Sequence, residues 1–210
     1  AEPGVALRSA GEVLGRFHQQ LRGFQRPIEC GWRSMKEEII AGLRERLERT
    51  RSTVSGNEAH PVSQEQIDQW MQELEALETT LSTDGDENWI IHGDYRAQNL
   101  KFDSDGHVRV ILDLDTARPA NRLFDLAYSL IFFPAVYQDM PLTRNQKSIF
   151  LHGYETACPL SETERKSLST HLRFAFLRGM TLWLHLHDFG GIREKTLPWI
   201  QGYLDSANTI

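Results

Sequence analysis

The sequence predicts an α+β fold that is mostly α-helical, with one small β-hairpin in the middle of a single domain of 210 residues. Over most of the chain, apolar residues recur with the 3.6-residue period of amphipathic helices. In the centre, two short apolar runs flank the turn Ser104-Asp105-Gly106, which is typical of a β-hairpin. So few strands exclude a Rossmann sheet or a barrel.

Three helices are expected in the first 85 residues, the N-terminal helical part. An apolar stripe from Val13 to Leu21 predicts the first helix. A Ser followed three residues later by Glu or Gln forms a capping box, and this spacing opens the second helix at Ser34 and the third at Ser63. The polar stretch 51–61 between these two helices predicts a loop.

The hairpin belongs to a central part, residues 86–118, which begins with the apolar run Trp89-Ile90-Ile91. A helical body, residues 119–210, follows it. There, Ser161 and Glu164 have capping-box spacing and predict the start of a long helix that runs towards His187.

Composition narrows the class of protein. The chain has 23 Lys and Arg against 29 Asp and Glu, so its formal charge of −6 disfavours nucleic acid and anionic membranes as partners and suits a cationic small molecule better. No apolar run approaches the roughly 20 residues of a transmembrane helix. With no signal peptide recognised, Cys30 and Cys158 are interpreted as free thiols of a cytoplasmic protein, although one disulfide is arithmetically possible.

The segment most informative about chemistry begins at residue 92 and reads HGDYRAQN, then the hairpin, then ILDLD at 111–115. Phosphoryl transfer needs a carboxylate that orients a hydroxyl and accepts its proton, and oxygen ligands that hold magnesium against phosphates. Protein kinases place the base Asp five residues before a magnesium-binding Asn, and a hairpin then returns a second metal-binding Asp. Asp94, Asn99 and Asp113 have this arrangement.

The segment resembles the aminoglycoside phosphotransferase and choline kinase family, whose loop reads His-Gly-Asp, four residues, then Asn. A hydrophobic-Asp-hydrophobic-acidic segment follows in that family and is matched here by 112–115. Residues 124–127 (FDLA) resemble the start of its Asp-Leu-Ala helix, and 14–18 (LGRFH) resemble the helix that opens its larger lobe. The resemblance implies the large, C-terminal lobe of a protein-kinase-like fold.

The resemblance also implies roles for individual residues. Asp94 would be the catalytic base, and Asn99 and Asp113 would bind Mg²⁺ and, through it, the phosphates of ATP. Three further residues would brace the loop: His92, Asp125 and Arg96. For Arg96 two roles stay open, pairing with a nearby carboxylate and contacting phosphate.

The implied reaction is ATP- and Mg²⁺-dependent transfer of the γ-phosphate to a hydroxyl of a small molecule. Aminoglycosides, amino alcohols, homoserine and sugars are the acceptors used by relatives. Helices within 34–81 and after Asn121 would form the acceptor site, where acidic residues would favour an amine: Glu37, Glu38, Glu73 and Asp139.

Two features depart from the family pattern. Nothing before His18 can form the N-terminal β lobe, which covers the phosphates and carries a Lys; this lobe is expected to have been removed, lost or supplied by another chain. Lys101 stands where relatives place an apolar residue under the nucleotide base. An alternative function is therefore a catalytically inactive kinase-like binding or scaffold module.

A third hypothesis is a metal-dependent phosphohydrolase that uses His171, His187 and Asp188. His185 and His187 also suggest a metal site, but positions i and i+2 of a helix face different directions, so they are not expected to share an ion unless the helix has ended. The kinase-like triplet at 188–190 (DFG) is interpreted as the end of the long helix, marked by two glycines.

Overall fold

The structure is a computed structural model that describes residues 3–24, 35–81, 88–133, 142–191 and 193–206. Cys30, Ser34 and Asp139, which carried sequence-based predictions, lie outside this range, as do the side chains of Glu37 and Glu38. The chain divides into two compact units. The first unit comprises Ala1–Glu29 and Thr83–Leu172, and the second comprises Cys30–Ser82 and Arg173–Ile210.

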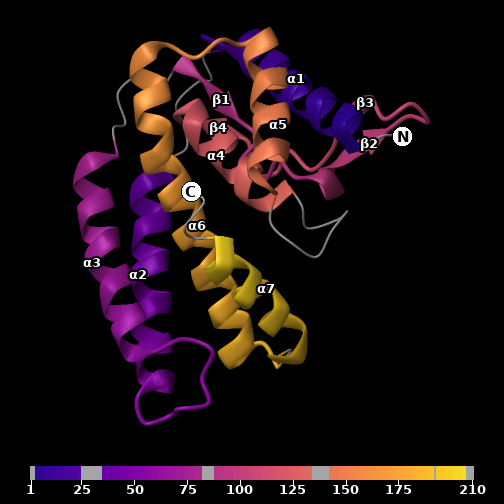
Figure 1. Cartoon of the computed structure of the whole chain (residues 1–210). Coiled ribbons are helices and arrows are strands. Elements are labelled where there is room, and N and C mark those ends of the chain that lie inside the picture. Colours follow the sequence, from indigo (N-terminus) through magenta and orange to yellow (C-terminus); the bar gives the residue numbers. More distant parts are fainter. Residues whose placement is uncertain (1–2, 25–34, 82–87, 134–141, 192, 207–210) are drawn as a thin grey trace. The chain divides into compact units, whose positions relative to one another are not determined.

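Two helices form the frame of the first unit, α1 (Pro3–Leu21) and α5 (Arg144–Ala157), and they lie side by side (Figure 1). Glycines allow their backbones to meet. A Cβ added to Gly11 would lie 2.0 Å from the carbonyl oxygen of Phe150, and one added to Gly153 would lie 2.2 Å from that of Arg8. The two helices therefore pack closer than side chains would permit.

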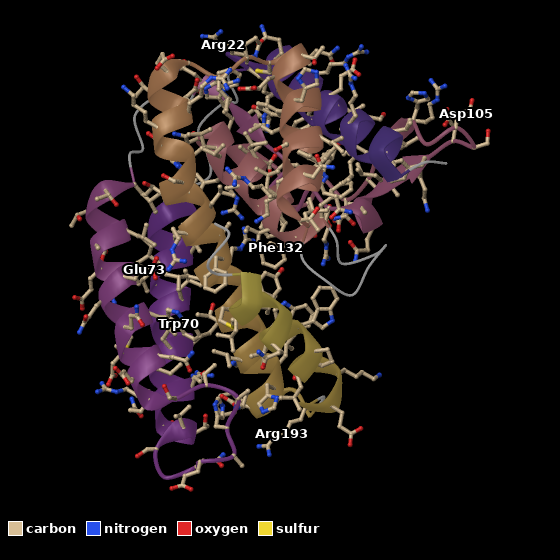
Figure 2. All side chains as sticks on the ribbon, viewed as in Figure 1. Arg22, Trp70, Glu73, Asp105, Phe132 and Arg193 are labelled. Atoms are coloured by element: carbon tan, nitrogen blue, oxygen red, sulfur yellow. The ribbon has the colours of Figure 1, made fainter. Side chains whose placement is uncertain are left out.

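Among its described residues, the first unit has four short strands. Strand β1 (Ile90–Ile91) pairs antiparallel with β4 (Arg118–Pro119). Strand β2 (Leu100–Phe102) pairs antiparallel with β3 (Val108–Ile111), with Asp105 at the tip of this hairpin (Figure 2). The hairpin predicted around the Asp-Gly turn is thus confirmed, whereas the β1–β4 pair was not predicted.

Helix α4 (Arg122–Phe132) is the most deeply buried element of the first unit: every one of its residues is buried. The side chain of Asn121 caps its N-terminus by accepting a hydrogen bond from the backbone of Leu123 at 2.9 Å. The loop after β1 is attached to α1 by a hydrogen bond: the Tyr95 hydroxyl donates to the carbonyl of Ala10 at 2.9 Å. The hydrogen bond of Tyr95 thus holds the segment between β1 and β2 against helix α1.

A buried arginine anchors the start of α4 to α6 (Glu162–Phe189). The guanidinium of Arg122 donates to both carboxylate oxygens of Glu164, at 2.7 and 2.8 Å, and stacks 4.3 Å from the Trp89 ring centre. Ser161 and Glu164 exchange the reciprocal hydrogen bonds of a capping box, 2.8 and 3.2 Å long. The predicted helix start is therefore confirmed.

The second unit is helical in its described part. It contains α2 (Met35–Val54), α3 (Gln64–Thr80), the C-terminal part of α6 and α7 (Arg193–Ser206) (Figure 1). The predicted capping box of Ser63 and Gln66 opens α3. Trp70 of α3 packs edge-on against Phe176, and Trp183 of α6 stacks on Trp199 of α7 with ring centres 5.1 Å apart.

Helix α6 ends at Phe189, and the backbone of Gly190 donates to the carbonyl of Leu186 at 3.0 Å. Gly191 follows with φ +67°, a left-handed conformation typical of helix ends. The triplet at 188–190 therefore terminates a helix, as predicted. The α+β, mostly helical class is confirmed as well. Within the described ranges, no helix combines the length and apolar character needed to cross a bilayer.

Candidate active site

The candidate site is built around the carboxylate of Asp94, in the loop that follows β1. Its side chain is 18% exposed, so solvent and small molecules can reach it. The Tyr128 hydroxyl donates to Oδ1 at 2.5 Å, and the Asn99 amide donates to Oδ2 at 2.9 Å. Two donors thus hold the carboxylate from opposite oxygens.

Arg96 stands beside the same carboxylate. Its Nε lies 3.1 Å from Oδ2 of Asp94, within ion-pair distance, but it is not aligned for a hydrogen bond with that oxygen or with another acceptor. The contact is therefore a Coulombic pair. Of the two roles left open by the sequence, the pairing with a carboxylate is present, and a contact with phosphate stays a prediction.

The Asn99 side chain has one oxygen left for another partner. Its Nδ2 donates to both the carbonyl oxygen and Oδ2 of Asp94, each at 2.9 Å, which uses both amide protons. Oδ1 of Asn99 therefore keeps its lone pairs. An amide oxygen of this kind is a ligand that Mg²⁺ accepts.

Asp125, at the start of α4, holds the backbone of the loop that carries Asp94. Its carboxylate accepts hydrogen bonds from the backbone N–H groups of His92 at 2.7 Å and Gly93 at 2.9 Å. His18 on α1 lies 3.1 Å from the same carboxylate, with its other ring nitrogen 2.8 Å from the hydroxyl of Tyr154. Burial acts to raise the pKa of Asp125, but the hydrogen bonds from His18, His92 and Gly93 outweigh burial and lower it.

Gly93 has φ +83°, which other residues rarely adopt. A Cβ there would also lie 2.7 Å from the carbonyl oxygen of Thr116. The Thr116 hydroxyl in turn donates to the carbonyl of His92 at 2.8 Å. A glycine is therefore required between His92 and Asp94 so that the 113–117 segment can pass close to the loop.

The β2–β3 hairpin brings the second acidic segment back to the loop. Beyond the last ladder pair, the backbone of Leu112 donates to the carbonyl of Asn99 at 2.8 Å, and its carbonyl lies 2.9 Å from Nε2 of His92. Asp113 comes next, exposed and with φ +61°, in the left-handed region. This conformation costs about 1 kcal/mol for a residue with a Cβ, and such strain concentrates at functional sites.

The structure brings Asp94, Asn99 and Arg96 into direct contact, and it connects His92 and Asp125 by a hydrogen bond. Asp113 follows Leu112, whose backbone is hydrogen-bonded to Asn99. The role of Asp113 as a metal ligand stays a prediction. Lys101 is exposed on β2. The side-chain oxygens of Asn99 and Asp113 are of the kind that magnesium binds, and a shared ion between them stays a prediction.

Two residues of the site were missed in the sequence. Tyr128 lies three positions after Asp125, a helical spacing that places both residues on the same face of α4. This spacing was a usable signal. His18 was noticed only within a family-like motif, because nothing local in the sequence connects it with Asp125, 107 residues away.

Comparison with known proteins identifies the family. The model of the phosphotransferase enzyme family matches residues 1–161. The chain belongs to this family. No curated protein gives a match to the chain.

Solved structures of the family type share the fold. An aminoglycoside phosphotransferase from Alicyclobacillus acidocaldarius is similar to 98% of the chain with a TM-score of 0.67 and 14% identity. A choline kinase from Cryptosporidium parvum gives 0.62 at 14% identity, and an ethanolamine kinase from Plasmodium vivax gives 0.61 at 12%, each again over 98% of the chain. The chain spans 63%, 65% and 59% of these three proteins.

The acidic residues expected to favour an amine acceptor are only partly described. Glu73 accepts two hydrogen bonds from the guanidinium of Arg173, 2.6 and 2.7 Å long, within the second unit. The carboxylate of Glu73, labelled in Figure 2, is therefore already neutralised by a structural partner. The amine preference stays a prediction.

Proposed function

We propose that this chain is the catalytic lobe of an ATP- and Mg²⁺-dependent phosphotransferase, which transfers the γ-phosphate to a hydroxyl of a small molecule. The acceptor classes are aminoglycosides, amino alcohols, homoserine and sugars. Membership of the phosphotransferase enzyme family supports the reaction type. The kinases among the similar solved structures support a small acceptor.

One observation carries the proposal: the Asp94 carboxylate is held from both oxygens and is still accessible. Tyr128 and Asn99 each take one acceptor position, while a carboxylate offers about four. The remaining positions would be available to an incoming hydroxyl. A group that is fixed in place and still has free lone pairs suits general-base catalysis.

In the proposed reaction, the acceptor hydroxyl donates its proton to Asp94 while its oxygen attacks the γ-phosphorus of ATP. The bond between that phosphorus and the bridging oxygen breaks, and ADP leaves. Asn99 Oδ1 and the Asp113 carboxylate would hold magnesium. The bound ion would offset negative charge on the phosphates, as in other phosphoryl transfers. The positive charge of Arg96, 3.1 Å from Oδ2, would help to hold the Asp94 carboxylate in place.

The test uses the full-length protein that contains this chain and follows ATP, ADP and phosphorylated acceptor by ³¹P NMR, with one acceptor from each proposed class. Asp94→Asn removes the base and keeps the size of the side chain, so we expect a loss of at least a hundredfold in turnover. Asp105→Asn, at the exposed hairpin tip, is the matched control and should retain full activity.

Circular dichroism spectra of both variants should match that of the parent protein. Turnover by Asp94→Asn at the parent rate would refute the assignment of the base. Tight ATP binding without acceptor-dependent ADP formation for any class would instead favour the inactive binding module.

A further inference from the structure

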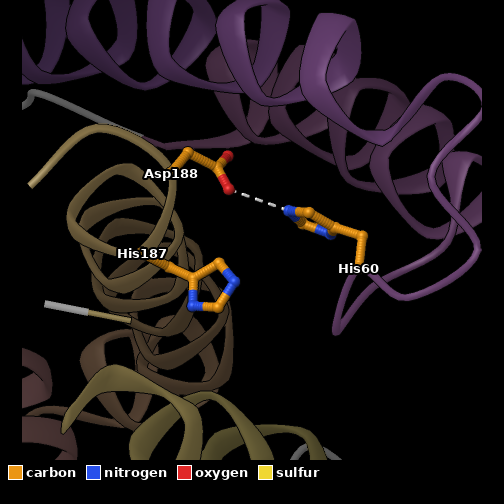
Figure 3. A group of neighbouring side chains, drawn as sticks. All are labelled: His60, His187 and Asp188. Carbon is orange, nitrogen blue, oxygen red and sulfur yellow. Dashed lines mark hydrogen bonds and ion pairs between the residues drawn. The ribbon is translucent and has the colours of Figure 1, made fainter. Parts of the chain in front are cut away.

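A second group of polar side chains lies in the second unit, apart from the residues of the candidate active site. His60 belongs to the loop between α2 and α3, and His187 and Asp188 belong to the end of α6 (Figure 3). Each of the three offers a nitrogen or oxygen ligand atom, and these atoms lie within 4.8 Å of one another. The side chains of His60 and Asp188 are only 3% and 2% exposed.

Hydrogen bonds fix which nitrogen of His187 carries the lone pair. Its Nδ1 lies 3.1 Å from the hydroxyl oxygen of Thr196. That hydroxyl donates its own proton to the carbonyl of Arg193 at 2.9 Å, so it can only accept from the imidazole. Nδ1 of the neutral ring is therefore protonated, and Nε2 of His187 is left as an electron-pair donor.

Backbone groups of Val62 hold the His60 ring. Its Nδ1 lies 3.1 Å from the carbonyl oxygen of Val62 and accepts a hydrogen bond of 3.2 Å from the Val62 N–H, and its Nε2 lies 2.9 Å from Oδ1 of Asp188. A ring nitrogen and a carboxylate oxygen that both carry lone pairs repel each other at 2.9 Å unless a proton or a cation lies between them. In the metal-free protein a proton lies between Nε2 of His60 and Oδ1 of Asp188, and a bound metal ion would displace this proton.

Asp188 has an outer partner as well. Its second oxygen, Oδ2, lies 2.9 Å from the Thr53 hydroxyl, which shares its one proton between Oδ2 and the carbonyl of Thr50 at 2.8 Å. All three side chains are thus held from behind, by Val62, Thr196 and Thr53. Outer partners of this kind orient the ligands of protein metal sites and raise their affinity.

We propose that His60, His187 and Asp188 bind one divalent transition-metal ion, for which zinc is the probe. Two imidazole nitrogens and one carboxylate oxygen are ligands typical of zinc and its neighbours, whereas magnesium prefers oxygen alone. Zinc ligands in a tetrahedral site lie about 3.4 Å apart, so small side-chain rotations bring the three atoms into place. Water would complete the coordination.

One of the three residues, His60, borders a cavity. A cavity of about 470 Å³ is lined by residues 54–58 and 60–64, and so by His60. Because His60 lies in the α2–α3 loop and the other two ligands lie on α6, a bound ion would tie these segments of the second unit together. The role assigned here is structural, and it is independent of phosphotransfer at Asp94.

The ligand set differs from the metal-binding groups considered in the sequence. His185 is not a member of this cluster, and Nδ1 of its ring is buried without a hydrogen-bond partner. His171 lies in the first unit, where its ring nitrogen lies 2.8 Å from the carbonyl of Ser167. The third ligand, His60, is 128 residues from Asp188, so no spacing in the sequence could indicate it.

The test is titration of untagged, EDTA-treated protein with ZnCl₂ by calorimetry, combined with thermal unfolding with and without zinc. We expect one zinc per chain and a higher unfolding temperature with zinc. The side-chain amide of Asn takes the place of Nδ1 and can either donate or accept a hydrogen bond there, but Asn has no atom in the place of Nε2. His187→Asn and His60→Asn therefore keep the outer hydrogen bonds, and each should bind zinc at least tenfold more weakly.

His185→Gln, two residues away on α6, is the matched control and should bind zinc like the parent protein. Zinc binding of equal affinity by His187→Asn, or no rise of the unfolding temperature with zinc, would overturn the proposal. The result is separable from the proposed function, because Asp94→Asn should leave zinc binding unchanged.

A measurement on the parent protein alone covers the case in which a variant fails to fold. Co²⁺ added in place of zinc should give visible absorption bands of a low-symmetry, four- or five-coordinate site, and zinc should abolish them. The weak spectrum of hexa-aqua Co²⁺ at one equivalent would contradict the site. Millimolar Mg²⁺ should not displace the bound Co²⁺.

Discussion

The hydroxyl of Tyr128 donates a hydrogen bond of 2.5 Å to Oδ1 of Asp94. Tyr128 also stacks on Phe132 one turn further along α4, with ring centres 4.3 Å apart. The stacking holds the Tyr128 ring in one orientation, and this orientation sets the position of its hydroxyl. A buried helix thereby sets the orientation of the proposed base.

The first prediction concerns this hydrogen bond. Tyr128→Phe keeps the ring and its stacking but removes the hydroxyl, so Asp94 should lose orientation while the fold is retained. A hydrogen bond to a charged group contributes about 1.5–3 kcal/mol of stabilisation. We expect its loss to raise the activation free energy of phosphotransfer by at least half of this amount. Steady-state kinetics should show kcat lowered about tenfold with KM for the acceptor unchanged. Full kcat in this variant would show that Tyr128 does not position the base.

A second prediction concerns the buried brace under the loop. Asp125→Asn replaces one carboxylate oxygen by an NH2 group, which faces N–H donors and cannot accept their hydrogen bonds. We therefore expect the unfolding free energy to fall by about 2–4 kcal/mol. Urea denaturation at pH 7 measures this change. Because the variant also releases His92 and Gly93, phosphotransfer should fall too. A loss below 1 kcal/mol would mean that His18 and the two backbone N–H groups find other partners.

A third prediction is a pH dependence of stability. Burial raises the pKa of Glu164, but hydrogen bonds from Arg122 and Ser161 outweigh it and lower the pKa from 4.5 to about 2. The lowered pKa means that the folded protein holds the charged form more strongly than the unfolded chain does. The stabilisation is therefore complete above pH 4.5 and is lost as the pH falls towards 2.

The difference in unfolding free energy between the parent protein and Glu164→Gln isolates this carboxylate from the other acids. We expect a difference of about 2–3 kcal/mol at pH 7 that shrinks towards zero by about pH 2. A difference that is the same at both pH values would contradict the assignment.

The fourth prediction uses two glycines as a matched pair. Gly11→Ala would place a methyl group 2.0 Å from the carbonyl of Phe150, so α1 and α5 must move apart. We expect a loss of at least about 2 kcal/mol in unfolding free energy. Gly42→Ala on α2 meets nothing within 4 Å and should be neutral or stabilise by up to about 1 kcal/mol. Equal effects at both positions would show that the close approach is not needed.

Features with a local signal could be predicted from the sequence. The hairpin follows from its Asp-Gly turn, and the capping boxes at Ser63 and Ser161 follow from a spacing of three residues, because the interacting atoms are close in the chain. The spacing of Asp94 and Asn99 is local in the same sense. Their hydrogen bonds cross only five residues.

Features that depend on contacts between distant segments of the chain could not be predicted from the sequence. Two-residue strands such as β1 and β4 have no periodicity to detect, and their pairing connects Ile90 with Pro119. The same holds for the contact of His18 with Asp125 and for the partners of His60. In each case an ordinary histidine or a short apolar run acquires its role only when the chain has folded.

The glycine-mediated contact of α1 with α5 also bears on how the chain acquires its structure during synthesis. His18 and Tyr154, which this contact brings together, are 136 residues apart. Helix α1 must therefore wait, with its apolar face uncovered, until its partner helix α5 has been translated. Chaperones that shield apolar segments of nascent chains would act on α1 during this interval.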